Sequence, residues 1–100
     1  MPKKPFPAGR EQAELLAIQA LGFIASDPER LGRFLSITGI GPAAIRAAAS
    51  EPRFLSGVLE HLAGDERLLL AFAQEHGLDP AVLEPARRAL AGQTSEDGGA

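Results

Sequence analysis

The chain has 100 residues, a formal net charge of −3 and no cysteine, tyrosine or tryptophan. Its length predicts one domain, and the lack of cysteine excludes a disulfide framework and a thiolate metal site. The negative charge and the lack of tyrosine and tryptophan argue against general nucleic-acid binding.

No segment has the pattern of an export or membrane signal. The basic N-terminal residues are interleaved with prolines, where a signal peptide needs an apolar run. The longest apolar region, residues 13–25, is interrupted by Glu14, Gln19 and Gly22, and is too short to span a bilayer. We therefore expect a cytoplasmic protein with no membrane partner.

Composition divides the chain into three parts. Residues 1–8 are rich in proline and residues 93–100 are small and polar, so both ends are expected to be disordered. Residues 9–92 are expected to form a single helical domain.

The first helix is predicted over about residues 10–26, and it is apolar around most of its circumference. Its large or apolar side chains are Leu15, Leu16, Ile18, Ala20, Leu21, Phe23 and Ile24. A helix of this kind is either central in a bundle or part of a subunit interface. The sequence leaves both interpretations open, and the run at residues 68–73 raises the same question.

The next three helices are predicted from their start signals and their apolar spacing. Asp27 and Pro28 begin the second helix, and Pro42 begins an alanine-rich third helix that ends at Ala49. Pro52 begins the fourth. Its apolar residues follow amphipathic spacing and are Phe54, Leu55, Val58, Leu59 and Leu62.

Two more helices complete the expected fold. Asp65 caps the fifth helix, and leucine and alanine content decides for helix over strand at residues 68–73. The sixth begins at Asp79 and Pro80, should kink at Pro85, and should end at Gly92. Three segments resemble one another, because each has an acidic residue followed by proline at the start of a predicted helix; they are residues 25–31, 49–55 and 77–83. Common helix-start chemistry explains them more simply than an internal repeat does.

A glycine corner is expected between the second and third helices. Gly39 fits a left-handed helix end of the Schellman type, with Ile40 folding back on Leu35. Gly41 would be the N-cap and Pro42 the first residue of the next helix. The predicted fold is therefore all-α: a compact bundle of five to six short helices with a glycine-cornered helical hairpin.

This corner, residues 37–42, resembles the helix-hairpin-helix motif, which grips the nucleic-acid backbone without reading its sequence. The resemblance covers residues 31–48 and implies that the amides of Gly39 and Gly41 would face a phosphate. Arg33 and Arg46 would supply nearby charge. The chain departs from the motif at Ala43 and Ala44, where a lysine or polar residue is common, and at Ile45, where a small residue is usual. Any tight helical corner also needs two glycines and a proline, so the motif is the alternative only.

No cofactor, metal or catalytic site is expected. The two histidines follow glutamates, at residues 60–61 and 75–76, but neither pair has a spacing that places two ligands on one helix face. The serines have no histidine nearby and no glycine pattern of a nucleophile elbow. The sequence therefore predicts a protein that is not an enzyme.

A wider resemblance covers residues 11–92. The segments 27–35 and 38–41, followed by Phe54, Leu55 and the run at residues 68–72, resemble a bacterial family of short all-helical proteins classed as a domain of unknown function. The resemblance implies an all-α domain in the bacterial cytoplasm, with no activity or ligand. The sequence thus predicts a small helical protein that acts through protein–protein contacts, as an adaptor or homodimer, with nucleic-acid backbone binding as the alternative.

Overall fold

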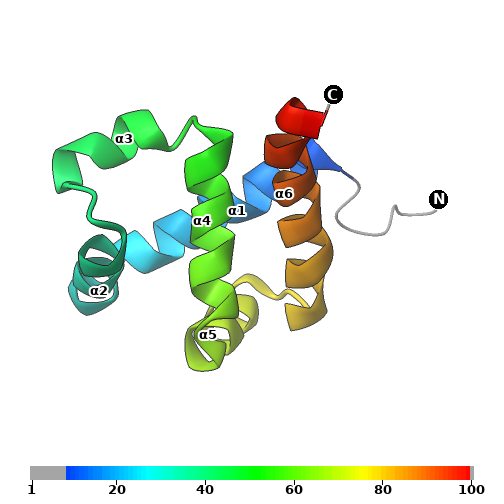
Figure 1. Ribbon diagram of the computed structural model, residues 1–100. Helices are drawn as coiled ribbons and strands as arrows, with labels where there is room; N and C mark the ends of the chain where they lie inside the picture. The colour runs from blue at the N-terminus through cyan, green and yellow to red at the C-terminus, as the bar shows by residue number, and fades with distance from the viewer. Residues whose placement is uncertain (1–8, 100) are drawn as a thin grey trace.

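The computed structural model describes residues 9–99, and the side chains of residues 9–41 and 43–91. Within that range the chain forms six α-helices and no strand (Figure 1). The helices are α1 Arg10–Ala25, α2 Pro28–Thr38, α3 Ile45–Ala48, α4 Pro52–Ala63, α5 Glu66–His76 and α6 Leu83–Gly99. Single 3₁₀ turns precede α3 (η1, Pro42–Ala44) and α6 (η2, Pro80–Val82). The predicted all-α fold is confirmed. The prediction of disorder at residues 1–8 concerns residues outside the described part.

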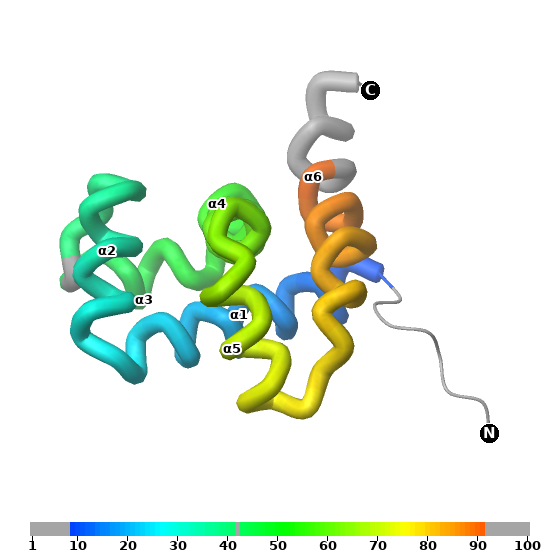
Figure 2. Tube along the Cα trace, turned by 90° about the horizontal axis from the view of Figure 1, so that it is seen from below, coloured from blue at the N-terminus to red at the C-terminus, as the bar shows by residue number. Residues whose placement is uncertain are grey.

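Helix α1 is the centre of the arrangement. Helices α4 and α6 run antiparallel to each other and cross α1, and α2 packs near its C-terminal end (Figures 1 and 2). Helix α5 packs mainly on α4, at the edge of the molecule. Of the two apolar segments whose position the sequence left open, α1 is therefore central and α5 is peripheral.

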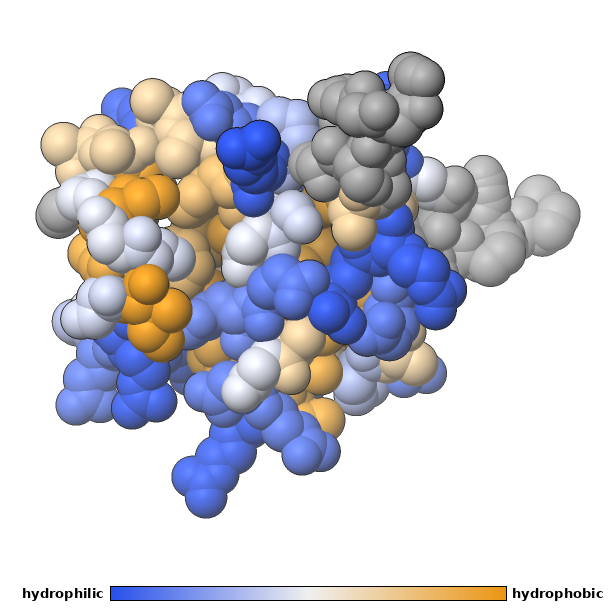
Figure 3. All heavy atoms as spheres, in the orientation of Figure 1, coloured by the Kyte–Doolittle hydropathy of each residue, from blue (hydrophilic) through white to orange (hydrophobic). Residues whose placement is uncertain are grey.

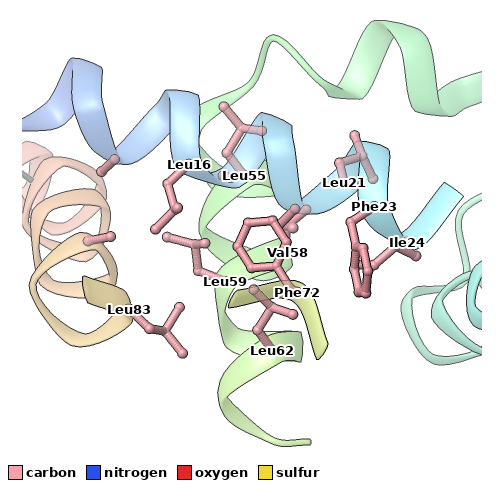
Figure 4. Close-up of a cluster of buried hydrophobic side chains, with 14 of the residues drawn as sticks. Leu16, Leu21, Phe23, Ile24, Leu55, Val58, Leu59, Leu62, Phe72 and Leu83 are labelled. Carbon is pink, nitrogen blue, oxygen red and sulfur yellow. The ribbon is translucent and has the colours of Figure 1, made fainter. Parts of the chain in front are cut away.

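The core is made mostly by one side of α1 and the facing sides of α4, α5 and α6 (Figure 4). Its buried members are Ala13, Leu16, Ala17, Ala20, Leu21, Phe23, Ile24, Phe34, Leu55, Val58, Leu59, Leu62, Leu68, Phe72, Leu83, Ala86 and Leu90. The fully buried alanines on α1 and Ala86 on α6 are small enough to let these helices approach closely. No buried polar or charged residue occurs in the described part of the chain.

Aspartates begin three of the helical segments, as predicted. The carboxylate of Asp27 accepts a hydrogen bond from the Arg30 amide at 3.2 Å, and that of Asp65 accepts one from the Leu68 amide at 3.2 Å. Asp79 does the same for η2. Each side chain satisfies an amide that has no partner within its own helix, and so fixes where the helix begins.

The two left-handed glycines end their helices in different ways. Gly39 has φ 76°, and its amide donates to the carbonyl of Leu35 at 2.8 Å, which is the simple left-handed ending. The Schellman pattern predicted there occurs instead at Gly77, where the Leu78 amide donates to the Ala73 carbonyl at 2.8 Å. At Gly39 the equivalent amide, that of Ile40, donates to the hydroxyl of Thr38, so it cannot make the Schellman bond.

Two predictions about the later prolines and glycines are wrong. Pro85 does not kink α6, because the 3₁₀ turn η2 precedes the helix and Pro85 falls in its first turn, where no amide bond is lost. Helix α6 also continues past Gly92, since one glycine inside a helix costs only about 1 kcal/mol and no proline follows it. Its span includes most of the segment that we expected to be a disordered tail.

Candidate interaction surface

The glycine corner makes its hydrogen bonds internally. The amides of Gly39 and Ile40 donate to Leu35 and Thr38, and the Thr38 hydroxyl donates to the carbonyl of Phe34 at 2.9 Å. The carbonyl of Gly41 accepts from Ala44 at 3.0 Å, which closes the turn η1. The corner exists as predicted, but α2 makes its main helix contacts with α1 rather than with α3.

This geometry weakens the resemblance to a phosphate-binding hairpin. The Gly39 amide, one of the two donors that the motif requires, is already used by the end of α2. After Pro42 the chain makes one 3₁₀ turn and then the four-residue α3, too short for a strong helix dipole. Arg33 lies on α2 and Arg46 on α3, both exposed.

A groove of about 230 Å³ lies between the first turns of α2 and the junction of α4 with α5. Its lining residues are Asp27, Glu29, Arg30, Arg33, His61, Asp65 and Leu68. A neighbouring hollow of about 340 Å³ shares Arg33, His61 and Asp65 with it and adds Ile37, Glu60 and Gly64. Sequence reasoning missed this groove, because its two walls are about thirty residues apart in the chain.

Most groups in the groove already serve the fold. Asp27 and Asp65 cap α2 and α5, and the guanidinium of Arg30 stacks over the Phe23 ring at 4.1 Å. The carboxylates on the groove wall outnumber the two arginines. A wall with this balance of charge has no net attraction for an anion.

The two histidines pack on different phenylalanines. His61 stands edge-on to the Phe34 ring, with the ring centroids 5.1 Å apart, and His76 packs on Phe72 at 4.7 Å. Burial lowers the pKa of His61; nearby Asp65 acts against this effect and Arg33 adds to it. The described residues contain no group of three or more side chains able to hold a metal ion, and none of the helices they form could cross a membrane.

An apolar stripe faces solvent on α1, on the side away from the core. Leu15 is 55% exposed and Ile18 is 46% exposed. Glu11, Gly22 and Ala25 are also exposed on this side, and a side chain added at Gly22 would meet no other atom within 4 Å. We call these five residues the outer stripe of α1.

The spacing of the outer stripe is that of a coiled-coil seam. Its members follow one another at alternating steps of four and three residues along α1. That spacing keeps side chains in one line, and it is how a helix presents a face to another helix. Leu15 and Ile18 are the second and third of its five members, away from both ends, where a packed partner would exclude more water than at the rim.

Two other large apolar side chains are exposed in the described residues, and each lies on a helix with no second exposed large apolar residue. Ile37 on α2 is 66% exposed and Leu70 on α5 is 47% exposed. On the face drawn in Figure 3, apolar atoms gather over α2 and the alanine-rich α3, while hydrophilic atoms cover much of α4 and α6. Isolated apolar residues are common on protein surfaces.

The chain was compared with known proteins and structures. No curated protein and no solved structure matches it at a significant level. A protein-family model does match, over residues 10–93, which include every described helix except the last residues of α6. The family resemblance seen in the sequence is thereby confirmed, and the chain belongs to the family described as Protein of unknown function (DUF3572).

Proposed function

We propose that this protein is not an enzyme and acts through protein–protein contacts, as an adaptor or homodimer, with the outer stripe of α1 as the contact surface. The observation that carries the proposal is the exposure of Leu15 and Ile18, two neighbouring members of a heptad-spaced line. Their own chain leaves about half of each side chain in water.

The energy available at this surface is modest. Burying a leucine or isoleucine side chain fully is worth about 1.5–3 kcal/mol. Because Leu15 and Ile18 are each about half exposed, covering both would contribute roughly 1.5–3 kcal/mol from one chain. Association has to overcome a loss of rotational and translational freedom that is at least as large. A single stripe therefore suits a partner that contributes an apolar face of its own.

Site-specific photo-crosslinking in cells that express the protein tests the proposal. A photoreactive amino acid at position 15 should give a discrete protein adduct, and the adduct should be lost when Ile18→Glu is added. The matched control places the same amino acid at position 70, because Leu70 is similarly exposed but lies on α5. Equal adducts from positions 15 and 70, or none from position 15, would contradict the proposal.

A titration with labelled duplex tests the nucleic-acid alternative. The exposed cations Arg33 and Arg46 could still contact phosphates, in which case duplex binding would weaken steeply with salt and would be lost in the double variant Arg33→Glu with Arg46→Glu. We expect no binding of a labelled duplex at tens of micromolar protein and low salt, because the corner leaves few donors for a phosphate.

A further inference from the structure

We propose that α2, η1 and α3 form an arm, residues 28–49, that opens as one unit while α1, α4, α5 and α6 stay folded. The arm is the part of the chain between the end of α1 and the start of α4. This inference goes beyond the proposed function and does not use the outer stripe of α1. Three features of the arm support it: its small share of the core, its local hydrogen bonds, and the few side chains that hold it.

The arm contributes little to the core. Among its described side chains Phe34 is the one that is buried, and α3 has none. By comparison, α1 buries seven residues, α4 four and α5 three. Other apolar side chains of the arm pack against the core but are only partly buried; they are Leu31, Leu35, Ile45 and Ala49. Because local stability follows the apolar surface that a segment buries, the arm should open at a lower free-energy cost than the other helices.

The hydrogen bonds of the arm are local. Within the described residues they stay inside the arm or reach its neighbours in the chain, which are Asp27, Ser50 and Glu51. The two ion pairs in the described part of the chain both belong to Arg87 of α6, and neither includes a residue of the arm. The arm can therefore move away from α1, α4, α5 and α6 without breaking a hydrogen bond to any of them.

Ring contacts of Phe34 and Arg30 hold the arm closed. The Phe34 ring stands edge-on to two rings of α4, with centroids 5.9 Å from Phe54 and 5.1 Å from His61. The guanidinium of Arg30 lies 4.1 Å from the centre of the Phe23 ring on α1. In both ribbon and tube views the arm lies on one side of α4 and α6 on the other (Figures 1 and 2). Opening therefore leaves the packing among α1, α4 and α6 in place.

Opening would also take apart the groove between α2 and the junction of α4 with α5. Arg30 and Arg33 lie on the wall that α2 provides, and His61 and Asp65 lie on the opposite wall. The arm carries its own wall away when it opens. The fold thus has a closed state that contains the groove, and an open state in which apolar side chains of α1 and α4 face solvent.

Native-state hydrogen exchange of the full chain, followed residue by residue by NMR, tests the arm. Detached α2 has 11 residues, too few to stay helical in water, so its amides exchange once the arm opens. The amides of Leu35 and Ala49 (the arm amides) should exchange about tenfold faster, or more, than those of Ala20 in α1 and Leu59 in α4 (the core amides), each relative to an unstructured chain. Exchange of the arm amides should also rise less steeply with urea, because partial opening exposes less surface.

Two variants separate the arm from the rest of the molecule. Leu83 is a buried residue of α6, on the far side of α4 from the arm (Figures 1 and 4). Leu83→Ala should speed exchange of the core amides about tenfold or more and leave the arm amides unchanged, because the open state keeps that contact. Phe34→Leu should speed both arm amides by the same factor, about tenfold, because it weakens the contact that closes the arm.

Three results would overturn the proposal. Equal exchange and equal urea dependence at arm and core amides would mean that the whole domain opens as one unit. Equal acceleration of both sets by Leu83→Ala would mean the same. If Phe34→Leu speeds exchange at Leu35 but not at Ala49, then α2 and α3 do not move together.

Discussion

Replacing Phe34 by alanine should release α2 from the rest of the molecule. Phe34 is the one buried residue of α2, with 0% of its side chain exposed. Its ring meets those of Phe54 at 5.9 Å and His61 at 5.1 Å, both edge-on and both on α4. Since Leu31 and Leu35 are only partly buried, no other side chain of α2 can replace that anchor.

The cost follows from the size of the cavity. Truncating a buried phenylalanine to alanine typically costs about 3–5 kcal/mol, and the whole domain is expected to have about 5–15 kcal/mol of stability. Phe34→Ala should therefore lose about 3–5 kcal/mol of unfolding free energy and sit close to the limit of folding. Urea unfolding followed by circular dichroism measures this loss, since the chain has no tryptophan or tyrosine to report by fluorescence.

The control lies on the same helix. Ile37 is 66% exposed, and Ile37→Ala should change the unfolding free energy by no more than about 0.5 kcal/mol. A loss below about 1 kcal/mol for Phe34→Ala, or equal losses for both variants, would refute the claim that one ring holds α2 in place.

Three further predictions concern single positions. Gly39→Val should cost about 1–3 kcal/mol, because φ is 76° there and a β-branched residue resists that conformation; Gly57→Ala, in the open middle of α4, should instead stabilise by up to about 1 kcal/mol, and thermal melts compare the two. Asp65→Ala should cost about 1 kcal/mol in urea unfolding by removing the cap on the Leu68 amide, and Glu66→Ala, next in the chain, should cost less. Burial lowers the pKa of His61 in the folded chain. As the pH falls, His61 is therefore protonated in the unfolded chain before it is protonated in the folded chain. The stability due to neutral His61 should be complete above about pH 6.5 and decline as the pH falls below it, and urea midpoints of wild type and His61→Gln should show a flatter pH profile for the variant.

Helix boundaries could be predicted well wherever one residue decides them locally. The carboxylates of Asp27 and Asp65 accept hydrogen bonds from the amides three residues ahead. Gly39 and Gly77 adopt the left-handed conformation that ends a helix. These interactions join residues within one turn of each other, so the sequence contains both partners side by side. The same holds for Phe34, whose place in an apolar stripe predicts its burial.

Predictions failed where a choice depended on a second, competing interaction. The Thr38 hydroxyl takes the Ile40 amide and so selects the simple ending over the Schellman pattern at Gly39. A 3₁₀ turn absorbs Pro80 and moves Pro85 into the first turn of α6. Contacts between distant residues were not predictable either: Arg87 binds Glu60, 27 positions earlier, with two nitrogens at 3.0 and 3.1 Å.

The position of α1 was the ambiguity that mattered for function, and the fold resolves only half of it. One side of α1 forms the centre of the core, and this explains why Leu16, Phe23 and Ile24 are apolar. Leu15 and Ile18 neither belong to the core nor pack against it, and water reaches about half of each side chain. Substitutions at 15 and 18 therefore test the proposed contact surface without opening the core.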